Sequence, residues 1–157
     1  MSRNSSKEPS SPVRTIAVNR RAHYDYHILE TLEAGLQLTG TEIKSIREGK
    51  VNLRDGYAFA EKGEIWLLNV HIARYEAGTR YNHEPTRPRK LLLHRKEIAY
   101  LAGKVSAKGF TLVPLRLYLK GRMAKVELGL ALGKKQYDKR QATMEREDQR
   151  ERAERPA

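Results

Sequence analysis

The stretch from Phe110 to Gly133 constrains the fold of this chain more than any other. Apolar and polar residues alternate along both of its halves, and Lys120-Gly121 separates the two halves. Alternation with a period of two is typical of strands that bury one face, and a glycine after a polar residue favours a tight turn. The predicted buried face consists of Val113, Leu115, Leu117, Leu119, Ala124, Val126, Leu128 and Leu130. The sequence therefore predicts a β-hairpin here.

Shorter alternating runs precede this hairpin. The stretch from Tyr24 to Gly40 predicts one bent strand or a second hairpin, because Gly35 and Gly40 interrupt its alternation. The dipeptides Asp55-Gly56 and Lys62-Gly63 predict turns that bound two further strands. Short strands divided by turn residues indicate a small β-rich domain.

Two segments break this pattern and predict short helices. In the first, Ile43 and Ile46 recur at helical spacing. Thr41 is a suitable N-cap for this helix, and Gly49 is a suitable end. The second segment has Gly109 as its stop signal, and its apolar residues at helical spacing are Leu93, Ile98, Leu101, Ala102 and Val105.

Five or six strands with two helices predict a mainly β protein. A closed sheet protects strand edges that an open sheet leaves unpaired, which favours a small OB-like closed β-barrel with flanking short helices. We assign residues 15–132 to this barrel. Residues 1–14 are rich in Ser, Pro and charge and are expected to form a disordered leader. Residues 133–157 carry few apolar side chains and are expected to form a disordered, charged tail.

The chain carries a large excess of positive charge. It has 31 Lys and Arg residues against 19 Asp and Glu, which gives a formal net charge of +12. A field of this sign attracts polyanions, and nucleic acid is the leading candidate partner. The apolar runs are far shorter than the roughly 20 residues of a membrane span, which argues against a membrane protein. Cysteine is absent, which excludes disulfides and thiolate metal sites.

Cations and aromatic residues gather in two regions. One surrounds the apolar triplet Leu91 to Leu93, and the other contains Arg20 and Arg21. Arginine favours bidentate contact with phosphate, and aromatic rings stack on unpaired bases. The alternatives are a solvated charged face for the cations and core packing for the rings. The other residues concerned are Arg87, Arg89, Lys90, Arg95, Lys96, His23, Tyr24, Tyr75 and Tyr81.

The sequence contains no recognisable catalytic pattern. It lacks a G-x-S-x-G elbow, a P-loop and a dinucleotide-binding fingerprint. His23, Asp25 and His27 would share one strand face and are residue types that bind metals, but a polar strand face is the favoured interpretation. We therefore expect no catalytic, metal or cofactor site.

The segment GKKQYDKR, from Gly133 to Arg140, follows directly on the last apolar run. It combines four cations with one tyrosine and one aspartate, and has no apolar surface with which to fold alone. On RNA, the cations would release counterions and the ring of Tyr137 would offer a face for stacking. We therefore expect this tail to become ordered on binding RNA.

Three stretches together resemble one known family. They are GTEIKSIREGK, EPTRPRKLLLH and VPLRLYLKGRMAKVELGLALGKKQYDKR, and the similarity runs from about Ile16 to Arg140. In them the chain is similar to the SsrA-binding protein, or small protein B, family. The resemblance implies a bacterial, cytoplasmic, monomeric adaptor of trans-translation that is not an enzyme. The implied partners are the tRNA-like domain of tmRNA and the small ribosomal subunit, whose vacant decoding centre and mRNA channel the tail would enter and there become helical.

The resemblance also implies roles for individual residues. The tmRNA-binding surface would comprise Asn19, Arg20, Arg21, His23, Tyr24, Glu42, Lys44, Arg47, Arg87, Arg89, Lys90, Leu92 and His94. The tail residues at the decoding centre would be Gly133, Lys134, Lys135, Tyr137, Asp138, Lys139 and Arg140. Tyr137 would stack on a base there, and Asp138 would shape the start of the turn or helix.

Two other functions stay open at this point. One is a ribosomal or ribosome-assembly protein that binds RNA through the same barrel, and the other is a nuclease or RNA-modifying enzyme. The adaptor requires two separate RNA surfaces, one on the barrel and one on the tail. Separating those surfaces by truncation distinguishes the adaptor from the ribosomal protein, and incubation with labelled RNA and a divalent metal tests for the enzyme.

Overall fold

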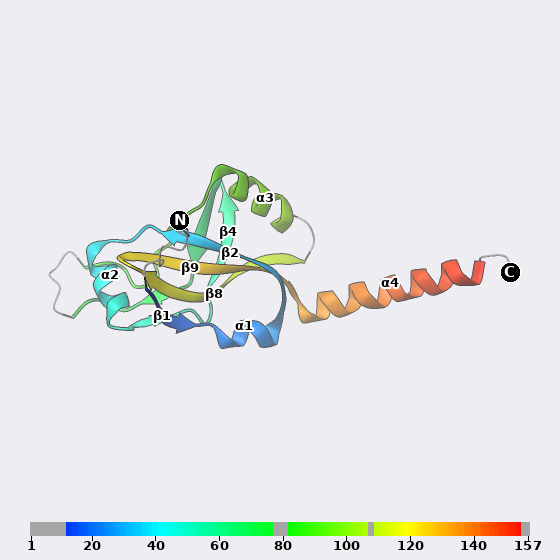
Figure 1. Cartoon of the computed structure of the whole chain (residues 1–157), viewed down its shortest axis with the longest axis horizontal. Coiled ribbons are helices and arrows are strands. Elements are labelled where there is room, and N and C mark those ends of the chain that lie inside the picture. Colours follow the sequence, from blue (N-terminus) through cyan, green and yellow to red (C-terminus); the bar gives the residue numbers. More distant parts are fainter. Residues whose placement is uncertain (1–11, 77–81, 107–108, 155–157) are drawn as a thin grey trace, which may run out of the picture.

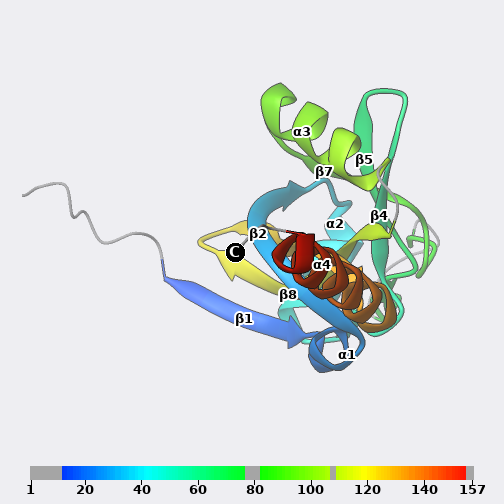
Figure 2. The same ribbon diagram turned by 90° about the vertical axis from the view of Figure 1, so that its right-hand side faces the viewer.

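The computed structural model describes residues 12–76, 82–106 and 109–154. These residues form a mainly β body with a long helix that extends away from it (Figure 1). Figures 1 and 2 show two short helices on opposite sides of the body, with the long helix leaving from one end. The helices are α1 (Arg20–Asp25), α2 (Gly40–Arg47), α3 (Arg95–Val105) and the long helix α4 (Lys134–Glu154).

The predicted hairpin between Phe110 and Gly133 is confirmed. Strands β8 (Phe110–Lys120) and β9 (Met123–Gly133) pair in antiparallel register along almost their whole length. Gly121 in the connecting turn has a φ of 63°, a left-handed conformation that favours glycine.

The buried face of that hairpin differs from the prediction. The register between β8 and β9 shifts between Pro114 and Arg116, which is a β-bulge or a similar irregularity. Val113 and Leu115 therefore belong to a small second cluster, whereas Leu117 belongs to the main core. The prediction of one continuous face was wrong because alternation with a period of two does not show where a bulge moves the following side chains to the other face of the strand. Pro114 was the available signal, since proline within a strand often marks such a position.

Six strands form a hydrogen-bonded ring. Pairing runs from β8 to β4 (Tyr57–Glu61), β5 (Glu64–Leu68), β7 (Arg89–Leu92), β2 (Tyr26–Leu36) and β9, which pairs again with β8. The β4–β5 turn is the predicted Lys62-Gly63 pair, whose φ angles are 51° and 78°. Of the two alternatives for residues 24–40, one long strand is correct, because β2 continues through Gly35.

Three further strands lie beside the ring. Strand β1 (Val13–Val18) pairs with β8, so regular structure begins inside the predicted leader. Strands β3 (Val51–Asn52) and β6 (His71–Ile72) form a separate two-stranded sheet. Residues 1–11, which make up the rest of the predicted leader, lie outside the described residues.

The main core fills the ring and fixes two helices against it. Ile46 of α2 and Leu101 of α3 are fully buried, together with Ile65, Leu112 and Leu128 from the strands. Full burial of such a side chain contributes about 1.5–3 kcal/mol. Both predicted helices are thus confirmed, and their apolar residues position them.

The N-cap of α2 is Thr39 rather than the predicted Thr41. The Thr39 hydroxyl accepts a hydrogen bond from the backbone N–H of Glu42, and Glu42 Oε1 accepts one from the backbone N–H of Thr39 at 2.8 Å. Such a capping box needs Glu or Gln three residues after the cap, a spacing that Thr39 has and Thr41 lacks.

The structure shows most of the tail as helix α4, which is the form that the family resemblance implies for it on the ribosome. Residues 134–154 contain neither glycine nor proline and are rich in Lys, Arg, Glu, Gln and Ala, which have high helix propensity. The helix projects from the end of β9 (Figure 1). Its side chains from Gln141 to Arg150 are exposed apart from half-buried Ala142. That the tail takes this form only on a ribosome stays a prediction.

Alanine substitutions at two glycines test how tightly the structure is packed around each of them. A Cβ at Gly56 would lie 2.7 Å from Val70 Cγ2 and 2.9 Å from Pro114 Cγ, whereas a Cβ at Gly103 of α3 would meet no atom within 4 Å. We expect Gly56→Ala to lower the free energy of unfolding by about 1–3 kcal/mol. Gly103→Ala should raise it by about 0.5–1 kcal/mol, because alanine stabilises helices. Urea titrations measure both, and shifts of the same sign would contradict this packing.

Candidate nucleic-acid interface

Helix α1 was not predicted, and its position depends on Asn19. The Asn19 side chain accepts a hydrogen bond from the backbone N–H of Ala22 and donates to the carbonyls of Leu53 and Pro114, at 3.2 and 3.0 Å. Asn19 is only 5% exposed. The structure therefore gives Asn19 a framework role that fixes α1, and the RNA contact that the resemblance implies for it stays a prediction. An Asn before a short polar run was the signal for this helix.

The remaining predicted residues of this region are exposed on α1. The ring of Tyr24 is 77% exposed, and Arg20, Arg21 and His23 are exposed beside it. Arg21 Nε lies 3.3 Å from Asp25 Oδ2. A polar hollow of about 470 Å³ adjoins the helix and is lined by Asn19, Arg21, Ala22, Asp25, Tyr26, Arg54, Asp55, Gly56, Tyr57, Thr111 and Val113. Cations, an exposed ring and a polar hollow suit contact with an RNA strand.

Glu42 and two arginines form a buried ion network between α2 and the start of β7. Arg87 donates to both carboxylate oxygens of Glu42, at 2.6 and 2.8 Å. Arg89 donates from Nε to Glu42 Oε2 at 2.7 Å, and its other nitrogens donate to the carbonyls of Val70 and Pro85. The side chains of Glu42 and Arg89 are fully buried. Both side chains therefore support the framework, and their direct contact with RNA stays a prediction.

The charge state of Glu42 follows from this network. Burial by itself would raise the pKa of Glu42, but hydrogen bonds from Arg87, the Thr39 N–H and Arg89 outweigh it and lower the pKa to about 2. Glu42 is thus ionised at neutral pH and carries the charge that Arg89 needs in the interior. The position of Glu42 at a helix start is compatible with a surface acid favoured by the dipole and with an acid that orients adjacent cations, and the structure shows the second arrangement.

The other predicted cations near this network are on the surface. Lys44 and Arg47 of α2 are exposed, and Lys44 Nζ lies 5.4 Å from the centre of the Tyr75 ring. Lys90 is half-buried and lies 3.3 Å from Glu64. Tyr81, the other predicted stacking residue, lies outside the described residues.

Leu92 and His94 line a groove of about 530 Å³ between β2, β7, α3 and β9. Leu92 is 47% exposed, which is unusual for a leucine on a strand next to a packed core. It pairs with Gly35 of β2, where a Cβ would come within 3.2 Å of Leu92 Cβ. The absence of a side chain at Gly35 therefore helps to form the groove.

The same groove contains charged residues that the sequence did not single out. Glu33 lines one side and Lys125 lies near it, together with Leu93 and Glu97. An exposed apolar residue with adjacent charges of both signs can contact the bases and the backbone of an RNA. The only sequence signal was the alternation of β2 and β9, which places Glu33 and Lys125 on outward faces.

The predicted residues therefore fall into three groups and not one patch. Figure 1 shows α1 at the end of the ring from which α4 departs and α2 near the other end. The groove at Leu92 and His94 forms the third group. In the tail, Gly133 ends β9 and Lys134 begins α4, while the side chains of residues 135–140 fall outside what the structure describes.

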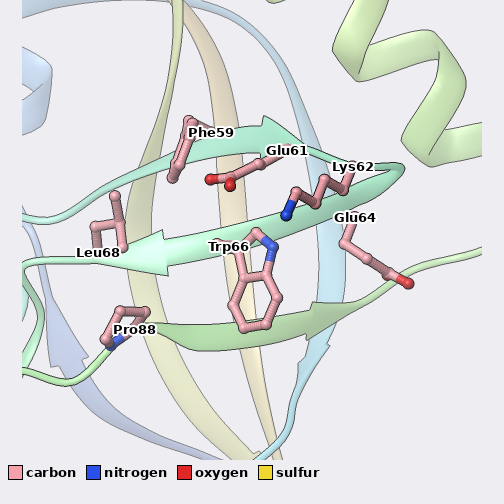
Figure 3. A pocket seen from close by; sticks show the side chains of 7 residues that line it. All are labelled: Phe59, Glu61, Lys62, Glu64, Trp66, Leu68 and Pro88. Atoms are coloured by element: carbon pink, nitrogen blue, oxygen red, sulfur yellow. The ribbon is translucent and has the colours of Figure 1, made fainter.

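Another hollow, of about 480 Å³, lies on the outer face of the β4–β5 hairpin (Figure 3). Its apolar lining consists of Phe59, Trp66, Leu68 and Pro88, and Glu61, Lys62 and Glu64 lie at the turn end. None of the predicted site residues lines it.

The metal alternative receives no support from the arrangement of its residues. His23 and Asp25 lie in α1 and His27 in β2, so they do not share one strand face as the sequence suggested. Within residues 12–76, 82–106 and 109–154, no three His, Cys, Asp or Glu side chains gather as metal ligands would. In the same part of the chain, no helix has the length and apolar character to span a membrane.

Comparison with known proteins identifies the family. The family model described as SmpB protein matches residues 16–156. The chain belongs to the SmpB family. The SmpB-family relative from Carboxydothermus hydrogenoformans, an SsrA-binding protein, is 62% identical over 138 residues, which cover 88% of this chain and 93% of the relative. The SsrA-binding protein of Geobacillus kaustophilus is 60% identical over 143 residues, covering 91% and 92%.

A solved SmpB-family structure matches the fold as well. It is described as "tmRNA-SmpB: a journey to the center of the bacterial ribosome". The match has a TM-score of 0.64 at 54% sequence identity and covers 78% of this chain and 85% of the solved one. The architecture described above is therefore that of the SmpB family.

The buried network predicts a specific pH dependence of stability. Glu42→Gln should lower the free energy of unfolding at pH 7 by about 3–5 kcal/mol, because Arg89 stays buried without its counter-charge. Because its pKa is lowered, ionised Glu42 stabilises the fold at pH values above the ordinary carboxyl range, and this stabilisation is lost as the pH falls toward 2. When the pH is lowered from 5 to 3, an interval of about two units around the ordinary carboxyl pKa, the free energy of unfolding should therefore fall less for the variant than for the unchanged protein.

Urea titrations at several pH values test this. Glu48→Gln is the matched control, since Glu48 forms an exposed pair with Lys50 just beyond the same helix. It should change stability little. Equal effects of the two substitutions would show that the buried network has no special role.

Proposed function

We propose that this protein is a tmRNA-binding adaptor of trans-translation. Its body binds the tRNA-like domain of tmRNA, and its C-terminal segment probes the vacant decoding centre and mRNA channel of a stalled ribosome. The observation that carries the proposal is membership of the SmpB family, with a 54% identical solved relative described with tmRNA and the ribosome. The net charge of +12 supports a polyanionic partner.

The six-strand ring serves as an OB-like barrel in this proposal, and its surface supplies the RNA contacts. The contact residues are Arg20, Arg21, His23, Tyr24, Lys44, Arg47, Arg87, Lys90, Leu92 and His94, with Glu33 and Lys125 added from the groove. Asn19, Glu42 and Arg89 keep these surfaces in place from beneath. The protein acts in the cytoplasm as a monomer, without a cofactor and without catalysing a reaction.

The tail forms the second RNA surface. Helix α4 projects from the ring at the end away from α2 (Figure 1). Gly133, Lys134, Lys135, Lys139 and Arg140 contact ribosomal RNA, Tyr137 stacks on a base, and Asp138 shapes the start of the helix. A projecting, charged helix with little apolar surface suits an RNA-lined channel, because RNA supplies the missing partner.

Removing one surface cation should change the salt dependence of binding. Lys44→Ala should weaken binding to the tRNA-like RNA and reduce the slope of log K against log salt by about one unit, if Lys44 contacts one phosphate. Arg122→Ala, an exposed cation in the β8–β9 turn, is the control and should leave the slope unchanged. Titrations at several salt concentrations measure both slopes. An unchanged slope for Lys44→Ala would remove Lys44 from the interface.

Truncation separates the two proposed surfaces. A chain lacking residues 134–157 should bind the tRNA-like RNA with nearly the same Kd and should fail to tag nascent chains on messages without a stop codon. A mobility-shift titration gives the first result, and a reconstituted translation system gives the second. Equal loss of both activities would contradict the two-surface proposal, and full retention of tagging would exclude a role for the tail.

A further inference from the structure

The groove at Leu92 contains a carboxylate, that of Glu33, whose position is fixed by other side chains. Glu33 lies on the outer face of β2, directly opposite Glu127 of β9. Its side chain is 41% exposed and lines the groove with Leu92 and His94. An exposed glutamate opposite another acid would be expected to turn away into solvent. Specific contacts from β8, which lies on the far side of β9, hold it instead.

Tyr118 provides the main contact. It is a mostly buried residue of β8, 4% exposed, and its hydroxyl donates a short hydrogen bond to Glu33 Oε2. Lys120, on the same face of β8, places its Nζ 3.8 Å from Glu33 Oε1. Each oxygen of Glu33 thus has a neighbour on β8, while the carboxylate keeps lone pairs free for a ligand in the groove.

We propose that Tyr118 is a positioning residue for RNA binding, which holds the ionised Glu33 carboxylate in the groove as a hydrogen-bond acceptor. The matching ligand is a donor on the RNA, either the amino or imino group of a base or a ribose hydroxyl. This inference rests on the proposed function and adds to it a residue that does not itself reach the RNA.

Arg116, also on β8, completes the arrangement. Its guanidinium carbon lies 4.3 Å from the centre of the Tyr118 ring, and its Nε lies 3.2 Å from Glu127 Oε1. Arg116 therefore holds the ring from one side and neutralises the acid that faces Glu33. With these contacts the hydroxyl of Tyr118 has one orientation toward β2, which is what a positioning role requires.

The charges around Glu33 support the same role. The Tyr118 hydrogen bond, together with Lys120 and Lys125, lowers the pKa of Glu33, and partial burial opposes this effect. Burial and Glu33 raise the pKa of Tyr118, so the phenol remains a donor over the whole ordinary pH range. The other charged or titratable groups facing this site are Glu127 on β9 and His94 and Glu97 across the groove.

The test is a double-mutant cycle on binding of the tRNA-like RNA by the full-length chain. Tyr118→Phe keeps the ring and removes the hydroxyl, and should weaken binding about fivefold to tenfold at pH 7. In a Glu33→Ala background the same change should have no further effect, because the carboxylate that it positions is gone.

A pH series separates positioning from simple loss of packing. Without the hydroxyl, Glu33 takes up a proton at higher pH. The Kd of Tyr118→Phe divided by the Kd of the unchanged protein should therefore increase as the pH is lowered from 7 to 5, an interval of about two units that approaches the ordinary carboxyl pKa. In the Glu33→Ala background this growth should disappear. A structural role alone would give a ratio that does not change with pH.

Tyr100→Phe is the matched control. Tyr100 of α3 donates to Glu30 Oε2 at 2.7 Å, and Glu30 lies on the same strand as Glu33 but does not line the groove. This variant also loses one tyrosine-carboxylate hydrogen bond and should bind RNA as the unchanged protein does. Urea titrations confirm that every variant is folded under the binding conditions.

The outcomes separate this inference from the proposed function. If the unchanged protein binds the tRNA-like RNA and Tyr118→Phe binds it equally well at both pH values, the inference is wrong and the proposed function stands. Additive effects of Tyr118→Phe and Glu33→Ala would also overturn the inference, since the two residues would then act independently. Failure of the unchanged protein to bind this RNA would overturn both.

Discussion

The buried carboxylate of Glu42 is the interaction on which the rest of the structure depends. It accepts hydrogen bonds from Arg87, from Arg89 and from the backbone at the start of α2. One side chain therefore fixes the first turn of a helix, the beginning of β7 and the loop that precedes it. Burying such charges is costly, and the cost is offset only when every member is paired and hydrogen-bonded. Arg89, which also binds the carbonyls of Val70 and Pro85, meets that condition.

This network changes the meaning of the positive charge on the chain. Arg87 and Arg89 stand two residues apart in the sequence and look equivalent there, yet one is partly exposed and the other has no exposed surface. Charge composition predicts a positive electrostatic field and a polyanionic partner. It does not distinguish cations that contact the partner from cations that support the fold. The same holds for the polar residue Asn19, because the three hydrogen bonds of its side chain all serve the framework.

Much of the fold could be predicted from the sequence because local patterns determine it. The β8–β9 hairpin, the Lys62-Gly63 turn and helices α2 and α3 all follow from alternation, turn residues or helical spacing. The register shift after Pro114 and the short helix α1 were missed although Pro114 and Asn19 were local signals for them, because both features also depend on contacts between distant residues such as Asn19 and Leu53. For the groove, Leu92 and His94 were predicted through a family resemblance, but Glu33 and Lys125 join them only through strand pairing.

Helix α4 has a mechanical consequence. Its 21 residues correspond to a rod of about 30 Å that is anchored at one end only, where β9 finishes. A rod of that kind is a lever arm: a rotation of the ring by about 10° would displace the far tip by about 5 Å, close to one helical turn. Small adjustments in how the globular part is seated would thus be amplified at the distal end, and an obstacle met by the tip would be transmitted back as torque.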